Sequence, residues 1–256
     1  MKVTMMTKLQ TLVNDHARAI AAAAQHHIQT AFSGVTSNAL AVARDAAAEV
    51  DLELEDLRRR RDNAEVNSAD FDRSERFLRG KRANAVTVAL NQKIVPELVA
   101  GEKQLSENGG PAPVSVGDLL TAAPFTQMLN SLAPDERPAF AESVILSYAM
   151  EKRSPAALLP ALRSALESKD LRGANGTPGK AWSKLHDMSE HAATLARTPD
   201  QVAATAAPDV ARSLRGGLKY MEEAFADPAG IEQSPAWRTG VLAPFGGPAS
   251  GLEQAQ

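Results

Sequence analysis

The sequence contains no cysteine among its 256 residues. This absence excludes disulfide bonds, cysteine nucleophiles and zinc sites built on thiolates. Aromatic residues are scarce at 4%, which argues against the thick core of a β-sandwich. No apolar run approaches the roughly 20 residues that a membrane-spanning helix needs, and the polar residues between Asn14 and Arg18 interrupt any signal-peptide core. We therefore expect no membrane span, and a protein that is either cytoplasmic or exported without a conventional signal peptide.

Neither sign of charge dominates, because 28 basic and 31 acidic residues leave a formal net charge of −3. A chain with this balance is not steered as a whole toward nucleic acid or an anionic membrane. Alanine is abundant, which favours helices that pack at close range. We therefore predict an all-α fold, in which long N-terminal helices form a hairpin or coiled-coil-like unit and a C-terminal bundle of shorter helices follows.

Apolar residues that recur with a helical period predict three long helices, over residues 3–33, 36–66 and 69–107. We expect the stretch FSGV, residues 32–35, to break or kink the chain between the first two helices, because Gly34 is a weak helix former. We expect Val95-Pro96 to interrupt the third helix. The apolar face of the first helix is wide enough to touch more than one neighbour. The second helix carries a short heptad-like seam at Val50, Leu54, Leu57, Arg61 and Ala64.

A stretch rich in glycine and proline, ENGGPAPVSVGD, is the clearest linker in the chain. We therefore predict a long-helix unit over residues 1–107, a linker over 108–117, a short-helix bundle over 118–227 and a Pro/Gly-rich tail over 228–256. In the bundle, a residue followed by proline marks the expected helix starts. These pairs are Ala133-Pro134, Ser154-Pro155, Thr177-Pro178, Thr198-Pro199 and Ala207-Pro208. Thr198 together with Gln201, three residues later, also fits a capping box.

The stretch DLRGANGTPGKAW, residues 170–182, has the glycines and the lysine of a phosphate-binding loop. The comparison fails because Ala174 stands where the first glycine is required, and Ala181 stands where a hydroxyl would hold magnesium. We interpret the stretch as a loop between helices, either a plain connection or a mobile loop that inserts into a partner's cleft. The candidate contact residues of this loop are Arg172, Gly173, Asn175, Gly176, Gly179 and Lys180.

The spacing of the histidines does not favour a metal site. His186 and His191 diverge by about 140° around a helix, and His16 and His27 lie about 16 Å apart along a helix axis. We interpret His16 and His27 as hydrogen-bonded core or interface residues, with a pH-sensitive seam as the alternative. Because no nucleophile with a nearby base emerges either, we predict no catalytic residue, no metal and no cofactor.

Charge is most sharply patterned around DLELEDLRRRRD, residues 51–62. Residues 45–56 hold six acids and no base, whereas residues 57–82 hold nine bases and five acids. One interpretation is a solvated helix held by the i,i+4 pairs Glu55–Arg59, Asp56–Arg60, Arg58–Asp62 and Arg61–Glu65. The other is a basic patch that docks an acidic protein surface or nucleic-acid phosphates. The patch would comprise Arg58, Arg59, Arg60, Arg61, Arg73, Arg76, Arg79, Lys81 and Arg82.

These observations favour a non-enzymatic helical protein that acts through protein–protein interaction or self-assembly, so a homo-oligomer stays open. A first alternative is a secreted bacterial effector that regulates a host protein through the 172–180 loop. A second is a virion or nucleoprotein-like structural subunit that uses the basic cluster within residues 58–82. A protein partner is favoured over nucleic acid, because the acidic segment before the arginines would repel phosphates passing along the same face.

Overall fold

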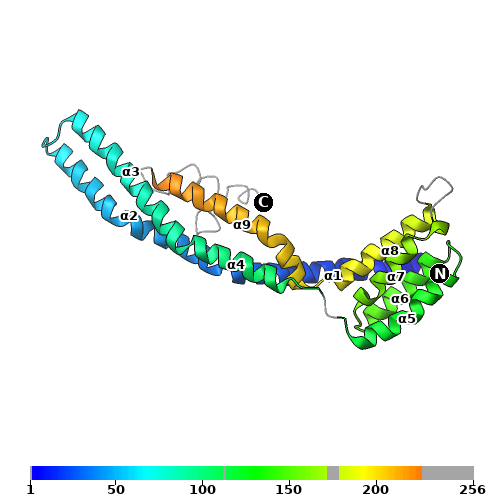
Figure 1. Cartoon of the computed structure of the whole chain (residues 1–256). Helices are drawn as coiled ribbons and strands as arrows, with labels where there is room; N and C mark the ends of the chain where they lie inside the picture. The colour runs from blue at the N-terminus through cyan, green and yellow to red at the C-terminus, as the bar shows by residue number, and fades with distance from the viewer. Residues whose placement is uncertain (1, 112–113, 172–178, 227–256) are drawn as a thin grey trace. The chain divides into compact units, whose positions relative to one another are not determined.

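The computed structural model describes residues 2–111, 114–171 and 179–226 (Figure 1). These residues form helices joined by turns, and no strand occurs among them, which confirms the predicted all-α fold. The chain divides into two compact units, each of which joins two separate segments. Unit 1 combines Met1–His26 with Gly109–Ala203, and unit 2 combines His27–Asn108 with Ala204–Gln256.

This division differs from the sequential one that the predicted linker suggested. One boundary, between Asn108 and Gly109, lies where the predicted linker begins, but the other two lie inside the helices α1 (Lys2–Ala31) and α9 (Pro199–Phe225). The apolar stripe of α1 continues past His26 without a change of composition, so the sequence has no signal at this point. The predicted tail, 228–256, lies outside the described residues.

Unit 1 is built around α8, which packs against α6, α7 and the short helix η1. Its core holds large aliphatic side chains, such as Leu129, Ile145 and Leu162, that are completely buried. Beside this core, the indole Nε1 of Trp182 donates a hydrogen bond to the Leu166 carbonyl at 3.0 Å. Besides the first part of α1 and the start of α9, the elements are α5 (Val116–Ser131), α6 (Arg137–Met150), η1 (Pro155–Leu158), α7 (Leu159–Leu166), η2 (Lys169–Leu171) and α8 (Lys180–Ala196).

The capping box predicted at the start of α9 is confirmed. The Thr198 N–H donates to Gln201 Oε1 at 3.0 Å, and the Gln201 N–H donates to the Thr198 hydroxyl at 3.3 Å. η1 begins at Pro155 as expected, but the Ser154 side chain makes no capping hydrogen bond. Proline therefore marks this start through its fixed backbone angle, and not through a capping hydroxyl beside it.

Two of the other proline-based starts are corrected by the structure, and the third lies outside the described residues. α6 begins at Arg137, after a turn that follows Ala133-Pro134. Pro208 lies inside α9, where no new helix starts. Thr177-Pro178 lies outside the described residues, and Gly179 occupies the N-cap position of α8 that we had assigned to Thr177. Proline by itself does not identify a helix start, because a long helix tolerates it when tertiary packing compensates for the lost hydrogen bond.

Unit 2 is dominated by a hairpin of α2 (Ser33–Asp62) and α3 (Ser68–Lys93), which run antiparallel side by side (Figure 1). α4 (Val95–Asn108) follows after a break at Ile94, which confirms the interruption predicted at Val95-Pro96. The break predicted within FSGV, residues 32–35, occurs at Phe32, and Gly34 itself lies inside α2. The remainder of α1 and most of α9 complete the unit.

The predicted seam of the second helix forms the core near the hairpin tip, but it is shorter than expected. Val50, Leu54 and Leu57 are buried against Phe71 and Leu78 of α3. The seam ends there, because Arg61 is exposed with its guanidinium 4.4 Å from the centre of the Phe71 ring. Ala64 lies in the turn after α2 with a positive φ of 58°, so it cannot continue the helical stripe.

A close helix crossing in unit 2 depends on Gly101. A Cβ atom at this position of α4 would lie 2.5 Å from the backbone oxygen of Ala31 and 3.0 Å from the Phe32 ring. Backbone cannot move aside as the end of a flexible side chain can. Gly101 therefore lets α4 approach the junction of α1 and α2.

We expect Gly101→Ala to destabilise the protein by about 2 kcal/mol, because the cost of overpacking exceeds the gain in helix propensity. Gly80→Ala is the matched control, since Gly80 lies inside α3 with no atom within 4 Å of an added Cβ. The control should gain up to about 1 kcal/mol from propensity alone. Urea unfolding followed by circular dichroism measures both changes, and equal effects at the two glycines would contradict the close crossing.

Candidate functional site

The basic residues singled out in the sequence all lie on the α2–α3 hairpin. Arg58, Arg59, Arg60 and Arg61 occupy the last turns of α2, and the others follow along α3. The hairpin does not collect them into one patch. Instead, the structure separates them into groups with different surroundings, and only one group combines charge with an exposed apolar surface.

Lys81 and Arg82 hold the two helices of the hairpin together. Lys81 Nζ lies 2.5 Å from Glu53 Oε1, and this hydrogen bond raises the pKa of the lysine. Arg82 Nε lies 2.6 Å from Asp51 Oδ1, and the arginine is only 5% exposed. Its Nη1 also donates to the Phe225 carbonyl of α9 at 2.8 Å. These two cations therefore connect the helices within unit 2, and Arg82 is not at the surface.

The antiparallel hairpin explains the charge pattern of the sequence. Because the chain reverses at the turn, the acidic stretch of α2 lies opposite the middle of α3, which carries Lys81 and Arg82. If α2 and α3 were shifted along each other by a few residues, the acidic side chains of α2 would no longer lie beside their basic partners on α3. The alternation of acidic and basic segments thus favours one register of the two helices.

Most other basic side chains are engaged by neighbours on their own helix. Arg59 pairs with Asp56, Arg79 Nη2 lies 3.2 Å from Glu75 Oε1, and Arg76 Nε donates to the Asp72 carbonyl at 3.1 Å. The four i,i+4 pairs predicted along α2 do not form. Glu65 follows the turn, so the helix ends before it can reach Arg61. The four absent pairs are Glu55–Arg59, Asp56–Arg60, Arg58–Asp62 and Arg61–Glu65.

An open groove on the hairpin, which we call the hairpin groove, combines two arginines with exposed apolar side chains. Leu52 of α2 is 68% exposed and Phe77 of α3 is 70% exposed, and both line this space of about 810 Å³. Apolar side chains that are exposed together, and not singly, are typical of interaction surfaces. The residues that line the groove are Leu52, Glu53, Asp56, Leu57, Arg60, Arg73, Ser74, Phe77 and Leu78.

The two arginines of the hairpin groove keep their hydrogen-bond donors available. Arg60 Nε lies 3.7 Å from Glu65 Oε2, and Arg73 Nη1 lies 3.7 Å from Asp70 Oδ1, so both contacts exceed hydrogen-bond distance. The acids that line the groove are engaged elsewhere, Glu53 by Lys81 and Asp56 by Arg59. The groove therefore presents an apolar centre beside two guanidinium groups that can each accommodate a carboxylate.

The glycine-rich loop cannot be placed as a site. Arg172, Gly173, Asn175 and Gly176 lie outside the described residues. Gly179 takes the N-cap position of α8 with an extended backbone, and Lys180 is the first residue of the helix. The mobile-loop hypothesis therefore stays a prediction from the sequence.

A second exposed apolar surface, which the sequence analysis missed, lies on α5. This helix buries Ala122, Phe125 and Leu129 on its inner side. It exposes apolar residues elsewhere on its surface, and no charged residue occurs in the sequence between positions 119 and 131. The signal that could have identified it is a helix that has apolar residues on more than one side and no charged residue after Asp118. The exposed residues are Val116, Leu119, Leu120 and Met128.

Other kinds of site find little support in the described parts of the chain. His16 belongs to unit 1 and His27 to unit 2. Within residues 2–111, 114–171 and 179–226, no group of three histidine, aspartate or glutamate side chains is placed to hold a metal ion. The helices of these same ranges include none that is long and apolar enough to cross a bilayer.

Comparison of the chain with protein families, with curated proteins and with solved structures finds no match. The function must therefore be argued from the surfaces of the molecule itself.

Proposed function

We propose that this protein is a non-enzymatic interaction protein, and that the hairpin groove binds a protein partner through a segment that carries a carboxylate next to an apolar side chain. The observation that carries this proposal is the exposure of Leu52 and Phe77 beside Arg60 and Arg73. Aromatic and arginine side chains dominate the energetics of many protein–protein interfaces. The groove has both kinds within one surface.

The apolar part of the groove supplies binding free energy. Covering a phenylalanine side chain that is mostly exposed is worth about 1.5–3 kcal/mol. The arginines add specificity, because a guanidinium forms two parallel hydrogen bonds with a carboxylate. A partner with an acidic residue beside an apolar one satisfies both parts at once.

A protein suits the groove better than a nucleic acid does. Glu53 and Asp56 line the same space as the two arginines, so a phosphate backbone would meet carboxylates along its path. The most deeply placed cation of the hairpin, Arg82, is already paired with Asp51. These features favour a mixed apolar and charged protein surface as the partner.

Photo-crosslinking tests the proposal directly. We expect Phe77→p-benzoylphenylalanine, introduced in the full chain in the cells that make the protein, to form a discrete crosslink with one protein. The crosslinked segment, identified by mass spectrometry, should contain an acidic residue within a few positions of an apolar one. Excess wild-type protein should suppress the crosslink, whereas excess Phe77→Ala protein should not.

The same photoreactive residue at Val88 serves as the control, because Val88 is also exposed on α3 but does not line the groove. An equal crosslink from both positions would remove the hairpin groove from consideration. A crosslink only to nucleic acid, or only to a second copy of this chain, would equally overturn the proposed partner.

A further inference from the structure

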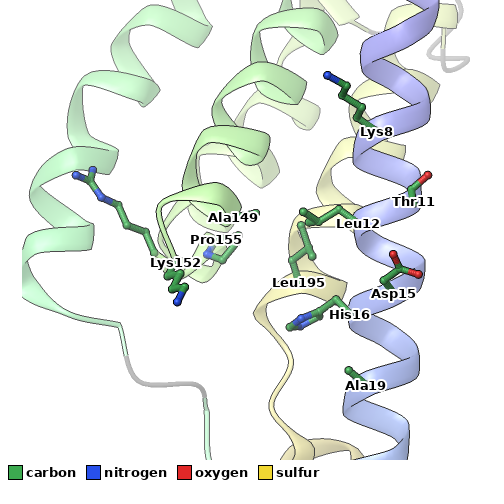
Figure 2. Close-up of a pocket in the computed structure, with 11 residues that line it drawn as sticks. Lys8, Thr11, Leu12, Asp15, His16, Ala19, Ala149, Lys152, Pro155 and Leu195 are labelled. Atoms are coloured by element: carbon green, nitrogen blue, oxygen red, sulfur yellow. The ribbon is translucent and has the colours of Figure 1, made fainter.

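Unit 1 contains an open pocket of about 950 Å³, formed by α1 together with the ends of α6 and α8 (Figure 2). Its apolar wall includes Leu12, Pro155 and Leu195. Its polar groups do not converge, because Lys8 lies two helical turns from His16 on α1 and its side chain points away from the histidine. The pocket therefore does not define a ligand site, whereas α5 of the same unit presents a continuous apolar surface.

The side that α5 buries fixes its orientation in unit 1. The helix packs on α6, α7 and η1. Phe125 and Leu129 are buried, and the Phe125 ring stacks on Phe140 of α6 with the ring centres 5.6 Å apart. The opposite side of α5 therefore faces away from the core of the unit.

That outer side carries an apolar stripe, which we call the α5 face and define as Val116, Leu119, Leu120 and Ala123. At about 100° per residue, these four positions lie within about 100° of one another around the helix. Val116 is 73% exposed and Leu120 is 70% exposed, so no described part of the chain covers the stripe. A helix normally buries an apolar stripe of this width against a neighbour.

No charged side chain interrupts the α5 face, since residues 119–131 contain neither acid nor base. Asp118 is held at the start of the helix, where its Oδ2 accepts a hydrogen bond from the Ser115 hydroxyl at 2.7 Å. An anionic membrane fits this face poorly, because helices that lie on such membranes carry lysine and arginine beside the apolar stripe. A charged protein surface also fits poorly, because its charges would lose water without gaining an opposite charge.

A second copy of the chain supplies a surface that does fit. In a two-fold symmetric dimer the same patch of both subunits meets itself, so the patch must be complementary to itself. An uncharged apolar stripe satisfies this condition, because no like charges are brought together. Ala123 lies toward the middle of α5 and is exposed. Its small side chain lets two helices approach closely, since the distance between packed helices depends on the side chains at the contact.

The area of the exposed apolar surface sets the strength of this pairing. Each large exposed side chain of α5 offers on the order of 100 Å² of apolar surface, so the three of the α5 face and the neighbouring Met128 together bury about 800 Å² in a pair. This is less than the roughly 1,200–2,000 Å² of stable interfaces. We therefore expect a reversible dimer, with a dissociation constant on the order of 100 µM.

We propose that this protein forms a reversible homodimer in which the α5 faces of two copies pack antiparallel about a two-fold axis beside Ala123. The antiparallel arrangement also brings opposite ends of the two helix dipoles together. The proposal is independent of the hairpin groove, because α5 belongs to unit 1 and the groove to unit 2.

Sedimentation velocity of the full chain, from about 1 µM to about 500 µM, tests the proposal. We expect a monomer at the low end and mainly dimer at the high end. Leu120→Glu should raise the dissociation constant at least about tenfold, because it places a charge of the same sign on both sides of an apolar contact. Met150→Glu is the matched control, since Met150 of α6 is 73% exposed in the same unit, and it should dimerise like the wild type.

An introduced thiol locates the contact, because the chain has no cysteine of its own. Ala123→Cys should give a disulfide-linked dimer under mild oxidation, whereas Ser183→Cys, exposed on α8, should not. A chain that stays monomeric at about 500 µM would overturn the proposal. Equal weakening by Leu120→Glu and Met150→Glu would also overturn it, as would binding to phosphatidylcholine vesicles that Leu120→Glu abolishes, since the face would then belong to a membrane.

Discussion

Arg137→Ala is expected to destabilise unit 1 by about 3 kcal/mol, because it removes a buried cation that several segments share. Arg137 is only 4% exposed. Its Nη2 lies 2.6 Å from Asp170, its Nη1 donates to the Ser168 hydroxyl at 3.1 Å, and its Nε donates to the Leu132 carbonyl at 3.1 Å. The alanine variant leaves these acceptors without their donor and opens a void beside them.

The pH dependence of this effect follows from Asp170. The hydrogen bond with Ser168 and those from Arg137 hold the pKa of Asp170 below its usual value. A carboxyl with a lowered folded-state pKa contributes stability above its unfolded pKa, and this stability is lost as the pH falls through the folded pKa. The difference between wild type and Arg137→Ala should therefore be full at pH 7 and should shrink below about pH 4, where an unperturbed aspartate protonates.

Tryptophan fluorescence can isolate this unit. The chain has two tryptophans, so a Trp237→Phe background leaves Trp182 of α8 as the only reporter. Urea unfolding in this background, at pH 7 and at pH 3.5, gives the two stability differences. A loss below about 1 kcal/mol at pH 7, the size expected of an exposed ion pair, would show that Arg137 does not organise these segments.

The helices were predictable from the sequence because their apolar residues recur with a helical period. The same holds for the hairpin, since Val50, Leu54 and Leu57 form a stripe that a neighbouring helix must cover. The unit boundaries were not predictable. Helices α1 and α9 each contribute to both units, and a helix that passes from one core to the next keeps its apolar period.

The candidate surfaces were predictable only in part. Arg60 and Arg73 belonged to the basic cluster found in the sequence, but the choice of these two depended on the antiparallel pairing, which occupies Lys81 and Arg82. The pocket of unit 1 was not predictable. It is lined by residues of α1, α6 and α8, such as Leu12, Ala149 and Leu195, and no spacing in the sequence connects residues so far apart.

We propose that the hairpin groove binds its partner through Arg60 and Arg73, so reversing both charges should have a large effect. Arg60→Glu/Arg73→Glu is expected to weaken binding of the crosslink-identified partner by at least about a hundredfold, or about 3 kcal/mol. Two charge-assisted hydrogen-bonded contacts are lost, and each is replaced by repulsion between carboxylates. Folding should change by less than about 1 kcal/mol, because both arginines make only long surface ion pairs.

Arg58→Glu/Arg76→Glu is the matched control, since it makes the same change of net charge on the same hairpin outside the groove. The decisive measurement is a binding titration with two forms of the partner, one with its natural contacting carboxylates and one with those carboxylates changed to arginine. Each form is titrated against wild type and against both double variants. The account predicts that the altered partner recovers affinity for Arg60→Glu/Arg73→Glu and loses it for wild type. Equal weakening by the two double variants, or no recovery with the altered partner, would contradict it.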